Sequence, residues 1–392
     1  MLGVILTPLL LTLLLATPSV TPLSHRLPSE SPPKSLHPLS LTIEQLGDQL
    51  GGIGRAKSLW TCLRSGVDPF DASGGVVSAR TLCQLGDLLQ GTSLVTAQLE
   101  SETESPCGGR KLLLRLSDGQ SVESVLIPSL PGDRTTLCVS SQLGCDRGCS
   151  FCLTSTMGLI RNLTSDEILS QVFIGLSLVR KYSLPKLTNV VFMGMGDAGR
   201  NLQEVGLTVQ GLTDKFRYSM AQNRITVSTV GPHPEVFPLL ARCPCNIAWS
   251  LHSPDNEIRR RLVPSSRHST ESLRESIVQA LLSRESLSAR SLMVAFTLIE
   301  GVNDSLEDAR KISEFMKPLR AVCSKLALDL IPYNDVNLSG YSRPSEERVI
   351  AFQNFLRKEG YFCMRRLTRG DSESAACGML ATKRIKSSLT LG

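Results

Sequence analysis

The chain has 392 residues, which is enough for two domains and a sizeable core. Hydrophobic residues make up 41% of the sequence and charged residues 20%, the balance of an ordinary globular protein. Twelve cysteines are too few for a disulfide scaffold in a chain of this length. The formal net charge of +6 fits a polyanionic partner, but such a charge is also common on the surfaces of soluble proteins.

Residues 1–40 have the features of a targeting leader that is cleaved or disordered. Residues 2–16 form an uncharged apolar run, similar to a signal peptide and shorter than the ~20 residues of a membrane-spanning helix. Residues 17–40 are rich in Ser, Pro, Leu and Thr and poor in acidic residues, as transit peptides are. This order predicts delivery to a plastid, with the mitochondrion, the cytoplasm and a membrane anchor as alternatives. We expect no stable membrane association after processing.

A small helical domain is expected over residues 41–106. Apolar residues recur at helical spacing in 43–50 and 56–64, and the glycines of 51–54 separate the two helices. This domain is a candidate for RNA contact, and a packing appendage is the alternative.

A β-hairpin extension is expected over residues 107–134. Residues 111–116 and 121–127 alternate between apolar and polar residues on either side of Asp118-Gly119. An Asp-Gly pair between two such runs is a strong hairpin signal. The hairpin leads directly into a loop with three cysteines.

Cys145, Cys149 and Cys152 follow one another with the spacing C-x3-C-x2-C. Four thiolates saturate a cubane [4Fe–4S] cluster, so three ligands from one loop leave one iron open to a chelating cofactor. This is the arrangement of radical S-adenosylmethionine (SAM) enzymes, in which the reduced cluster splits SAM to a 5′-deoxyadenosyl radical. A zinc knuckle is the alternative, but zinc sites pair two CxxC units or add histidines at fixed spacing, and neither follows here. An oxygen-sensitive cluster also needs a reducing compartment.

Short apolar runs alternate with helical patterns over residues 135–382. The strands that we expect cover 137–140, 189–193, 224–228, 246–250, 292–298 and 327–331. An amphipathic helix is expected over 165–181, with Thr164-Ser-Asp-Glu167 as its capping signal. Repeated βα units imply a parallel sheet whose functional loops follow the carboxyl ends of the strands. The fold class is therefore α/β, with a basic tail over 383–392.

A series of short motifs occurs in order along residues 41–382. They include Thr136-Leu-Cys-Val-Ser-Ser-Gln-Leu-Gly-Cys145, Arg161-Asn-Leu-Thr164, Gly194-Met-Gly196, Ser228-Thr-Val-Gly231, Ser250-Leu-His252, Gly301-Val-Asn-Asp304, Leu330-Ile-Pro-Tyr-Asn334, Thr368-Arg-Gly-Asp371 and Ala375-Ala-Cys-Gly378. Together they resemble the RlmN-type adenine-C2 RNA methyltransferases. The resemblance implies that 135–382 form the partial, open (β/α)6 TIM-like barrel of radical SAM enzymes.

The resemblance also implies which residues bind SAM. These are Gly196, Asp197, Ser228, Ser250, Leu251, His252 and Asn334. The family has Gly-Glu-Pro where this chain has Gly196-Asp-Ala198. Asp197 keeps a carboxylate for the SAM ammonium group, one methylene shorter, and Ala198 lacks the rigid turn of proline. We therefore expect SAM to bind, with an affinity outside the family's norm. Each of these residues taken alone is also an ordinary strand-end or turn residue.

Two further cysteines, Cys138 and Cys377, match family motifs. C2 of adenine is electron-poor and has no lone pair for polar methyl transfer. In the family, one SAM methylates the cysteine aligned with Cys377, and a radical from a second SAM activates that methyl group for addition to C2. Cys138 then attacks Cys377, which releases the methylated base and forms a transient disulfide. Glu123 aligns with the family's proton acceptor, and an exposed hairpin carboxylate is the alternative for it.

The implied substrate is large-subunit ribosomal RNA, with tRNA as an alternative. The implied partner is an electron donor such as flavodoxin or ferredoxin, and we expect a monomer. Candidate phosphate contacts are Arg365, Arg366, Arg369 and the basic tail, together with 259–261, for which a solvated helix face is the first expectation. Two other functions remain open: C8 methylation of adenine, as in the Cfr-like branch of the family, and a catalytically degenerate RNA-binding protein.

Overall fold

The computed structural model describes residues 37–72, 75–106, 108–129, 132–336, 340–366 and 380. Predictions for most of the leader, for Cys377 and for the basic tail fall outside these residues. No helix in the described part of the chain is long and apolar enough to cross a membrane.

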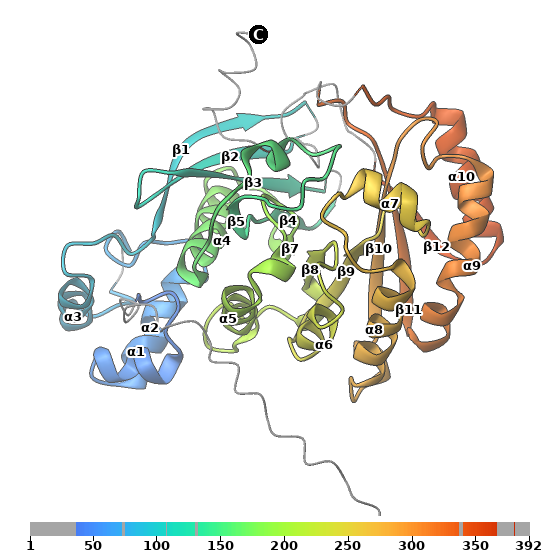
Figure 1. Cartoon of the computed structure of the whole chain (residues 1–392). Coiled ribbons are helices and arrows are strands. Elements are labelled where there is room, and N and C mark those ends of the chain that lie inside the picture. Colours follow the sequence, from blue (N-terminus) through green and yellow to red (C-terminus); the bar gives the residue numbers. More distant parts are fainter. Residues whose placement is uncertain are drawn as a thin grey trace, which may run out of the picture. The chain divides into compact units, whose positions relative to one another are not determined.

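The strands form one mixed sheet and one small ribbon (Figure 1). The ten-stranded sheet has the order β1-β2-β3-β4-β7-β8-β9-β10-β11-β12, and β5 pairs with β6 in the ribbon. The strands are β1 (Ala97–Glu104), β2 (Arg110–Leu116), β3 (Ser121–Pro128), β4 (Thr135–Cys138), β5 (Gln142–Gly144), β6 (Leu159–Asn162), β7 (Leu187–Phe192), β8 (Ile225–Thr229), β9 (Asn246–Ser250), β10 (Ser291–Leu298), β11 (Lys325–Pro332) and β12 (Phe362–Arg365). Every neighbouring pair from β4 to β12 is parallel. The predicted α/β class with a mostly parallel sheet is confirmed, and the curvature of a partial barrel stays a prediction.

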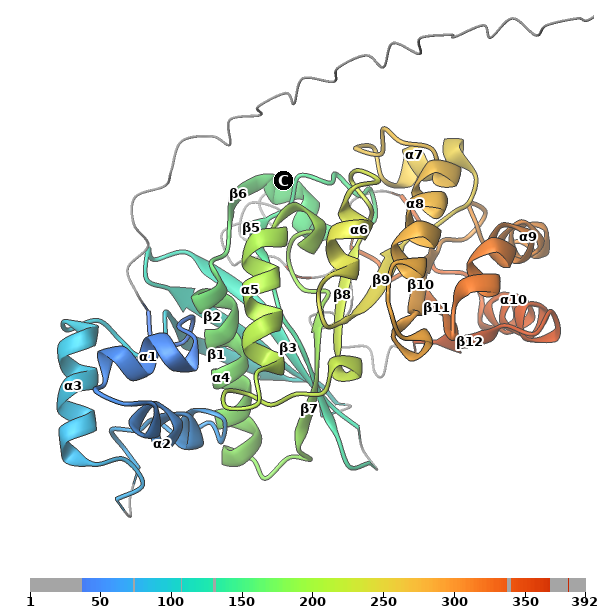
Figure 2. The ribbon, with the colours of Figure 1, turned by 90° about the horizontal axis from the view of Figure 1, so that it is seen from below.

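Helices alternate with the parallel strands and lie in a row beside them (Figure 2). They are α4 (Ser165–Lys181), α5 (Leu202–Thr213), α6 (Val236–Ala241), α7 (Asn256–Leu262), α8 (Thr270–Leu282), α9 (Leu306–Val322) and α10 (Glu346–Lys358), with the short 3-10 helices η1 (Leu153–Met157), η2 (Ala198–Arg200), η3 (Gln222–Arg224) and η4 (Leu287–Ala289). The sequence predicted both ends of α4 and its capping box. The Thr164 hydroxyl accepts from the Glu167 amide (3.3 Å), and the Glu167 carboxylate accepts from the Thr164 amide (2.9 Å).

The predicted hairpin is formed by β2 and β3, with Gly119 at a positive φ of 80° in its turn. It is not a separate appendage, because β3 pairs antiparallel with β4 and so continues the main sheet. β1 pairs with β2 on the other side. Residues 97–104, which we assigned to the helical domain, therefore form a strand of the sheet.

The helical unit consists of α1 (Ile43–Gln49), α2 (Ile53–Leu63) and α3 (Ala79–Leu89). Trp60 of α2 is fully buried, and its ring lies edge-on to Tyr218 with centroids 5.1 Å apart. Arg64 donates to the carbonyl of Phe216 at 2.6 Å, and Ser177 of α4 donates to the carbonyl of Gly66 at 2.8 Å. The unit thus shares the hydrophobic core of the α/β part, and its contact with RNA stays a prediction.

Candidate active site

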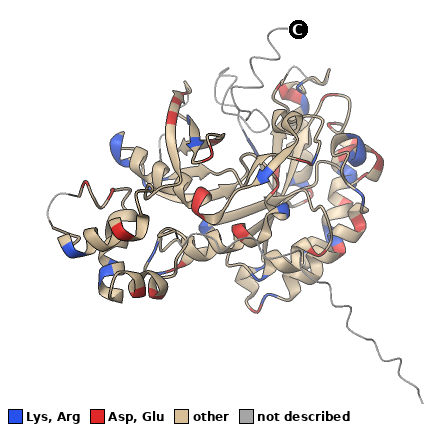
Figure 3. Cartoon of the chain, turned by 60° about the vertical axis from the view of Figure 1, so that its left-hand side comes forward, with Lys and Arg blue, Asp and Glu red and all other residues tan. Residues whose placement is uncertain are grey.

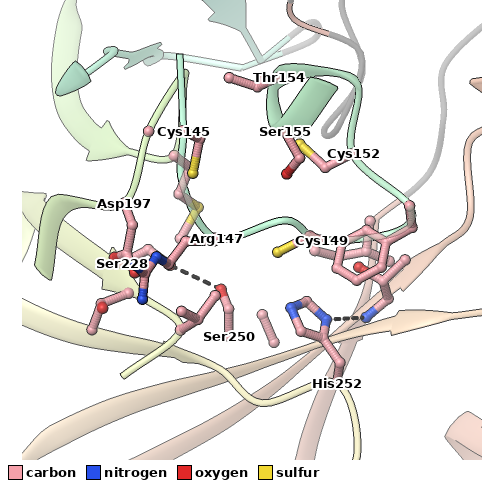
Figure 4. Close-up of a pocket in the computed structure, with 18 of the residues that line it drawn as sticks. Cys145, Arg147, Cys149, Cys152, Thr154, Ser155, Asp197, Ser228, Ser250 and His252 are labelled. Atoms are coloured by element: carbon pink, nitrogen blue, oxygen red, sulfur yellow. Dashed lines mark hydrogen bonds between the residues drawn. The ribbon is translucent and has the colours of Figure 1, made fainter. Parts of the chain in front are cut away.

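Cys145, Cys149 and Cys152 lie on the loop that joins β5 to η1, and all three line one cavity (Figure 4). Gly144 begins the loop with a φ of 77°, and a Cβ on it would lie only 1.9 Å from the carbonyl oxygen of Gly158. Only glycine allows this close approach. The amide of Cys145 donates to the same carbonyl at 2.8 Å. The structure therefore brings the three predicted cluster ligands to a single cavity.

Burial makes the Cys145 and Cys149 thiols weak acids in the metal-free protein. It raises the pKa of Cys145 to about 12 and that of Cys149 well above its ordinary value. Because metals bind thiolates, assembly of a cluster here releases protons. No three His, Cys, Asp or Glu side chains among the described residues lie close enough together to share one metal ion. The ligands of a cubane cluster do not share one metal ion, because each cysteine binds a different iron. Three thiols spread around one cavity fit this arrangement (Figure 4).

The opposite wall of the cavity is built at the carboxyl ends of β7 to β11. The cavity opens to solvent, and its empty space including that mouth is about 950 Å³. The predicted SAM-binding residues that line it are Gly196, Asp197, Ser228, Ser250, His252 and Asn334. The hydroxyls of Ser228 and Ser250 lie 3.2 Å apart. Gly196 has a φ of 95°, and a Cβ on it would lie 2.5 Å from Cβ of Gln142, so a side chain has no room at this turn.

The Asp197 carboxylate is buried beside the cavity. Oδ1 accepts from the Gly199 amide at 3.0 Å, and Oδ2 makes no hydrogen bond of ordinary geometry among the described residues, although interactions with Thr229 and Val230 stabilise the charged carboxylate. The Asp197 amide donates to Oε1 of Gln142 at 2.8 Å, which fixes the backbone. Burial raises the pKa of Asp197. A buried carboxylate is stabilised by a nearby cation, and the ammonium group of SAM is such a cation.

His252 presents a neutral imidazole to the cavity. Its Nδ1 accepts from the Thr297 amide at 3.2 Å, so the ring proton resides on Nε2. Burial lowers the pKa of His252 to about 3. The ring packs against Phe151 of the cysteine loop with centroids 4.7 Å apart, and the backbone has a positive φ of 64°. A neutral donor is thus held in one orientation between the cysteine loop and the strand ends.

Arg259 corrects one of our sequence predictions. It is only 1% exposed, so it belongs neither to a solvated helix face nor to an RNA-binding surface. Its guanidinium donates to the carbonyls of Val230, Ser250 and Leu251, which lie at or just beyond the carboxyl ends of β8 and β9. Leu251, a predicted SAM contact, is fully buried and does not line the cavity. Residues 260–261 are exposed, as predicted.

Sequence reasoning missed Arg147, which lies between two of the cluster cysteines. It is 8% exposed and lines the cavity next to Asp197 and Cys145 (Figure 4). Its Nε donates to Oδ1 of Asp146 at 2.9 Å. Its place within the three-cysteine loop was the one available signal, because that loop was expected to face the cofactor.

Glu123 and Cys138 lie on β3 and β4, next to the cavity but not in its wall. Glu123 is 4% exposed, which rules out the alternative of an exposed hairpin carboxylate. Its Oε1 lies 2.7 Å from Nζ of Lys111, which is buried as well. Cys138 is 7% exposed and pairs across the sheet with Val125, two residues beyond Glu123. Cys377 falls outside the described residues.

Of the predicted phosphate contacts, Arg365 and Arg366 are described and both are paired with carboxylates. Arg366 lines the cavity and donates to Oδ2 of Asp329 at 2.7 Å. Arg365 donates to Glu346. Arg369 and the basic tail lie outside the described residues. Arg366 therefore lines the cavity while 33% of its side chain stays exposed.

The chain is similar to known proteins over most of its length. No protein-family model matches it. It is 34% identical over 363 residues to the dual-specificity RNA methyltransferase RlmN of Marinomonas sp. (strain MWYL1), a match that covers 88% of this chain and 93% of that protein. It is also 34% identical over 351 residues to the RlmN of Syntrophotalea carbinolica, covering 88% of this chain and 89% of that protein. The crystal structure of a radical SAM methyltransferase from Sphaerobacter thermophilus matches with a TM-score of 0.78 and 32% identity, over 87% of this chain and 98% of that one.

Proposed function

Because this chain belongs to the RlmN family of radical SAM RNA methyltransferases, we propose that it forms 2-methyladenosine in ribosomal RNA. The observation that carries the proposal is the single cavity that is lined by three cysteine thiols, the buried Asp197 carboxylate and the neutral His252. Neither a degenerate binding protein nor a zinc site needs this combination. tRNA is a second candidate substrate, because the similar proteins are named as dual-specificity enzymes.

The cavity divides into a cluster side and a SAM side. Cys145, Cys149 and Cys152 would hold a [4Fe–4S] cluster, and Asp197 and His252 would bind SAM from the strand ends. When bound, the cluster and SAM supply a carbon radical, which can modify a carbon that polar methyl transfer cannot reach. The protein's own groups orient SAM and keep water from its reactive end.

The methyl group would pass through the protein before it reaches the base. In this proposal Cys377 carries the methyl group on its sulfur, and two SAM molecules are used for each methylation. Glu123 accepts the proton that leaves C2, and Cys138 attacks Sγ of Cys377 to release the product as a disulfide forms. The burial of Glu123 supports its role as proton acceptor, since a buried carboxylate is shielded from bulk water.

The partners follow from the same proposal. The reaction needs an external electron donor such as flavodoxin or ferredoxin. We also propose that the protein is a monomer and that its helical unit contacts the RNA. In the view of Figure 3, basic and acidic residues alternate along the ribbon. Because the chain has few aromatic residues for stacking, we propose that recognition relies on RNA shape and base flipping. The leader composition supports a plastid, with the mitochondrion and cytoplasm as alternatives.

The test is anaerobic reconstitution of the full chain, followed by SAM, reductant and unmodified ribosomal RNA or tRNA, with mass spectrometry of the digested nucleosides. 2-Methyladenosine is the expected product. 8-Methyladenosine would move the chain to the Cfr-like branch. A loaded cluster that cleaves SAM without methylating either RNA would contradict the proposal. Cys377→Ala should abolish product without loss of iron, and Cys138→Ala should accumulate a covalent RNA adduct.

A further inference from the structure

Arg147 is a buried cation with most of its hydrogen-bonding capacity unused. The residue is 8% exposed and lines the cavity. Only its Nε donates to a described residue, Asp146, and neither Nη nitrogen has a hydrogen-bond partner among the described residues. A guanidinium carries five N–H donors, so the end that faces the cavity can bind a planar anion.

Asp146 fixes the direction of this guanidinium from outside the cavity. Its Oδ1 binds Nε of Arg147 at 2.9 Å, and its Oδ2 lies 3.3 Å from Nη2 of Arg200, which is 39% exposed at its side chain. Asp146 is thus held by two arginines, one on each side. The inner arginine faces the cavity and the outer one faces solvent, so the anchor leaves the two Nη groups of Arg147 directed inward.

Arg147 and Asp197 lie beside each other in the cavity and carry opposite charges (Figure 4). Their charges attract each other, and no hydrogen bond joins them among the described residues. Both groups are buried and both line the cavity. An α-amino acid group satisfies both at once, because it carries an ammonium and a carboxylate on the same carbon.

We propose that Arg147 binds the carboxylate of SAM while Asp197 binds its ammonium group, so that the two residues recognise the amino-acid end of the cofactor. The inference rests on the proposed function and adds to it a specificity-determining residue within the cluster loop. Bidentate contact with guanidinium would also fix the orientation in which SAM approaches the open iron.

The test compares two ligands and two matched variants. SAM carries the amino-acid end, whereas 5′-methylthioadenosine has the same nucleoside without it. Equilibrium dissociation constants are measured for the anaerobically reconstituted full chain and for Arg147→Met and Arg147→Lys. Iron and sulfide content are determined for every preparation. Arg310→Met is the control, because Arg310 is 67% exposed at its side chain and does not line the cavity.

Arg147→Met should weaken SAM binding by about 10- to 100-fold, the loss expected for a charge-assisted hydrogen bond, and change 5′-methylthioadenosine binding by less than about twofold. Arg147→Lys should lose less, and Arg310→Met should resemble the wild type. Equal losses for both ligands, or no loss for SAM, would overturn the inference. So would weaker RNA binding with unchanged SAM affinity. If Arg147→Met fails to load iron, the lysine variant decides between these outcomes. A wild-type protein that loads iron but binds no SAM would instead refute the proposed function.

Discussion

The buried ion pair between Lys111 and Glu123 gives a sharp prediction for stability. Its Nζ and Oε1 atoms lie 2.7 Å apart, and the side chains are only 9% and 5% exposed. Lys111→Met keeps the length of the side chain and removes its charge. The variant removes the Lys111 charge from beside the buried Glu123 carboxylate. Loss of one partner of a buried pair typically costs about 3–5 kcal/mol. Because the free energy of unfolding of a native protein is about 5–15 kcal/mol, this loss should be a large part of the total stability.

Urea-induced unfolding of the metal-free protein, followed by circular dichroism, measures this loss. Arg115→Met is the matched control, because Arg115 is on the same strand and pairs with Glu100 at 3.4 Å while being 58% exposed. An exposed pair of this kind contributes about 0–1 kcal/mol. The double variant Lys111→Met with Glu123→Leu should recover most of the stability, since it removes both buried charges. A loss below about 1 kcal/mol in Lys111→Met, or a double variant no better than the single one, would refute the reasoning.

Three further predictions concern the cavity. Cys149→Ala should lower the iron bound after reconstitution to background, whereas Cys243→Ala should leave it unchanged; equal iron in both would contradict the cluster assignment. Gly196→Ala should weaken SAM binding by more than tenfold, because the new methyl group would lie 2.5 Å from Cβ of Gln142 at a positive φ, and an unchanged affinity would show that this turn relaxes. Burial lowers the pKa of His252 to about 3, below its unfolded value of about 6.5, so the unfolded state binds an extra proton and stability falls as pH drops from about 6.5 towards 3. Unfolding measured at several pH values should show a slope smaller by about one proton in His252→Gln, and equal slopes would count against a buried neutral imidazole.

Local signals predicted those elements whose ends are marked in the sequence. α4 was predicted from end to end because a capping box starts it and an amphipathic pattern continues to Lys181. β9 was also predicted with both ends, since its buried apolar centre, Ile247-Ala-Trp249, directly precedes the Ser-Leu-His motif. β1 was missed because Ala97–Glu104 is mostly exposed and rich in glutamate, so it lacks the apolar alternation of a strand.

The features that sequence analysis missed depend on contacts between residues far apart in the chain. Arg259 belongs to a run of three arginines that indicates a surface, yet its acceptors include the carbonyls of Val230 and Ser250, which two different strands bring together. The contact between Lys111 and Glu123, by contrast, could have been predicted from the hairpin. In the hairpin register Lys111 faces Val125 and Leu113 faces Glu123, so Lys111 and Glu123 are diagonal neighbours on one face of the sheet.

The strand β1 also affects how copies of this protein meet. An edge strand offers unpaired amide and carbonyl groups to any other extended chain and is a common starting point for aggregation. β1 carries Glu100, Glu102 and Glu104, and its pairing register shifts between Leu99 and Ser101. Charge and an irregular register both make it a poor template for a second β1. The glutamates that made this strand hard to predict from the sequence thus also disfavour pairing between the β1 edges of two molecules.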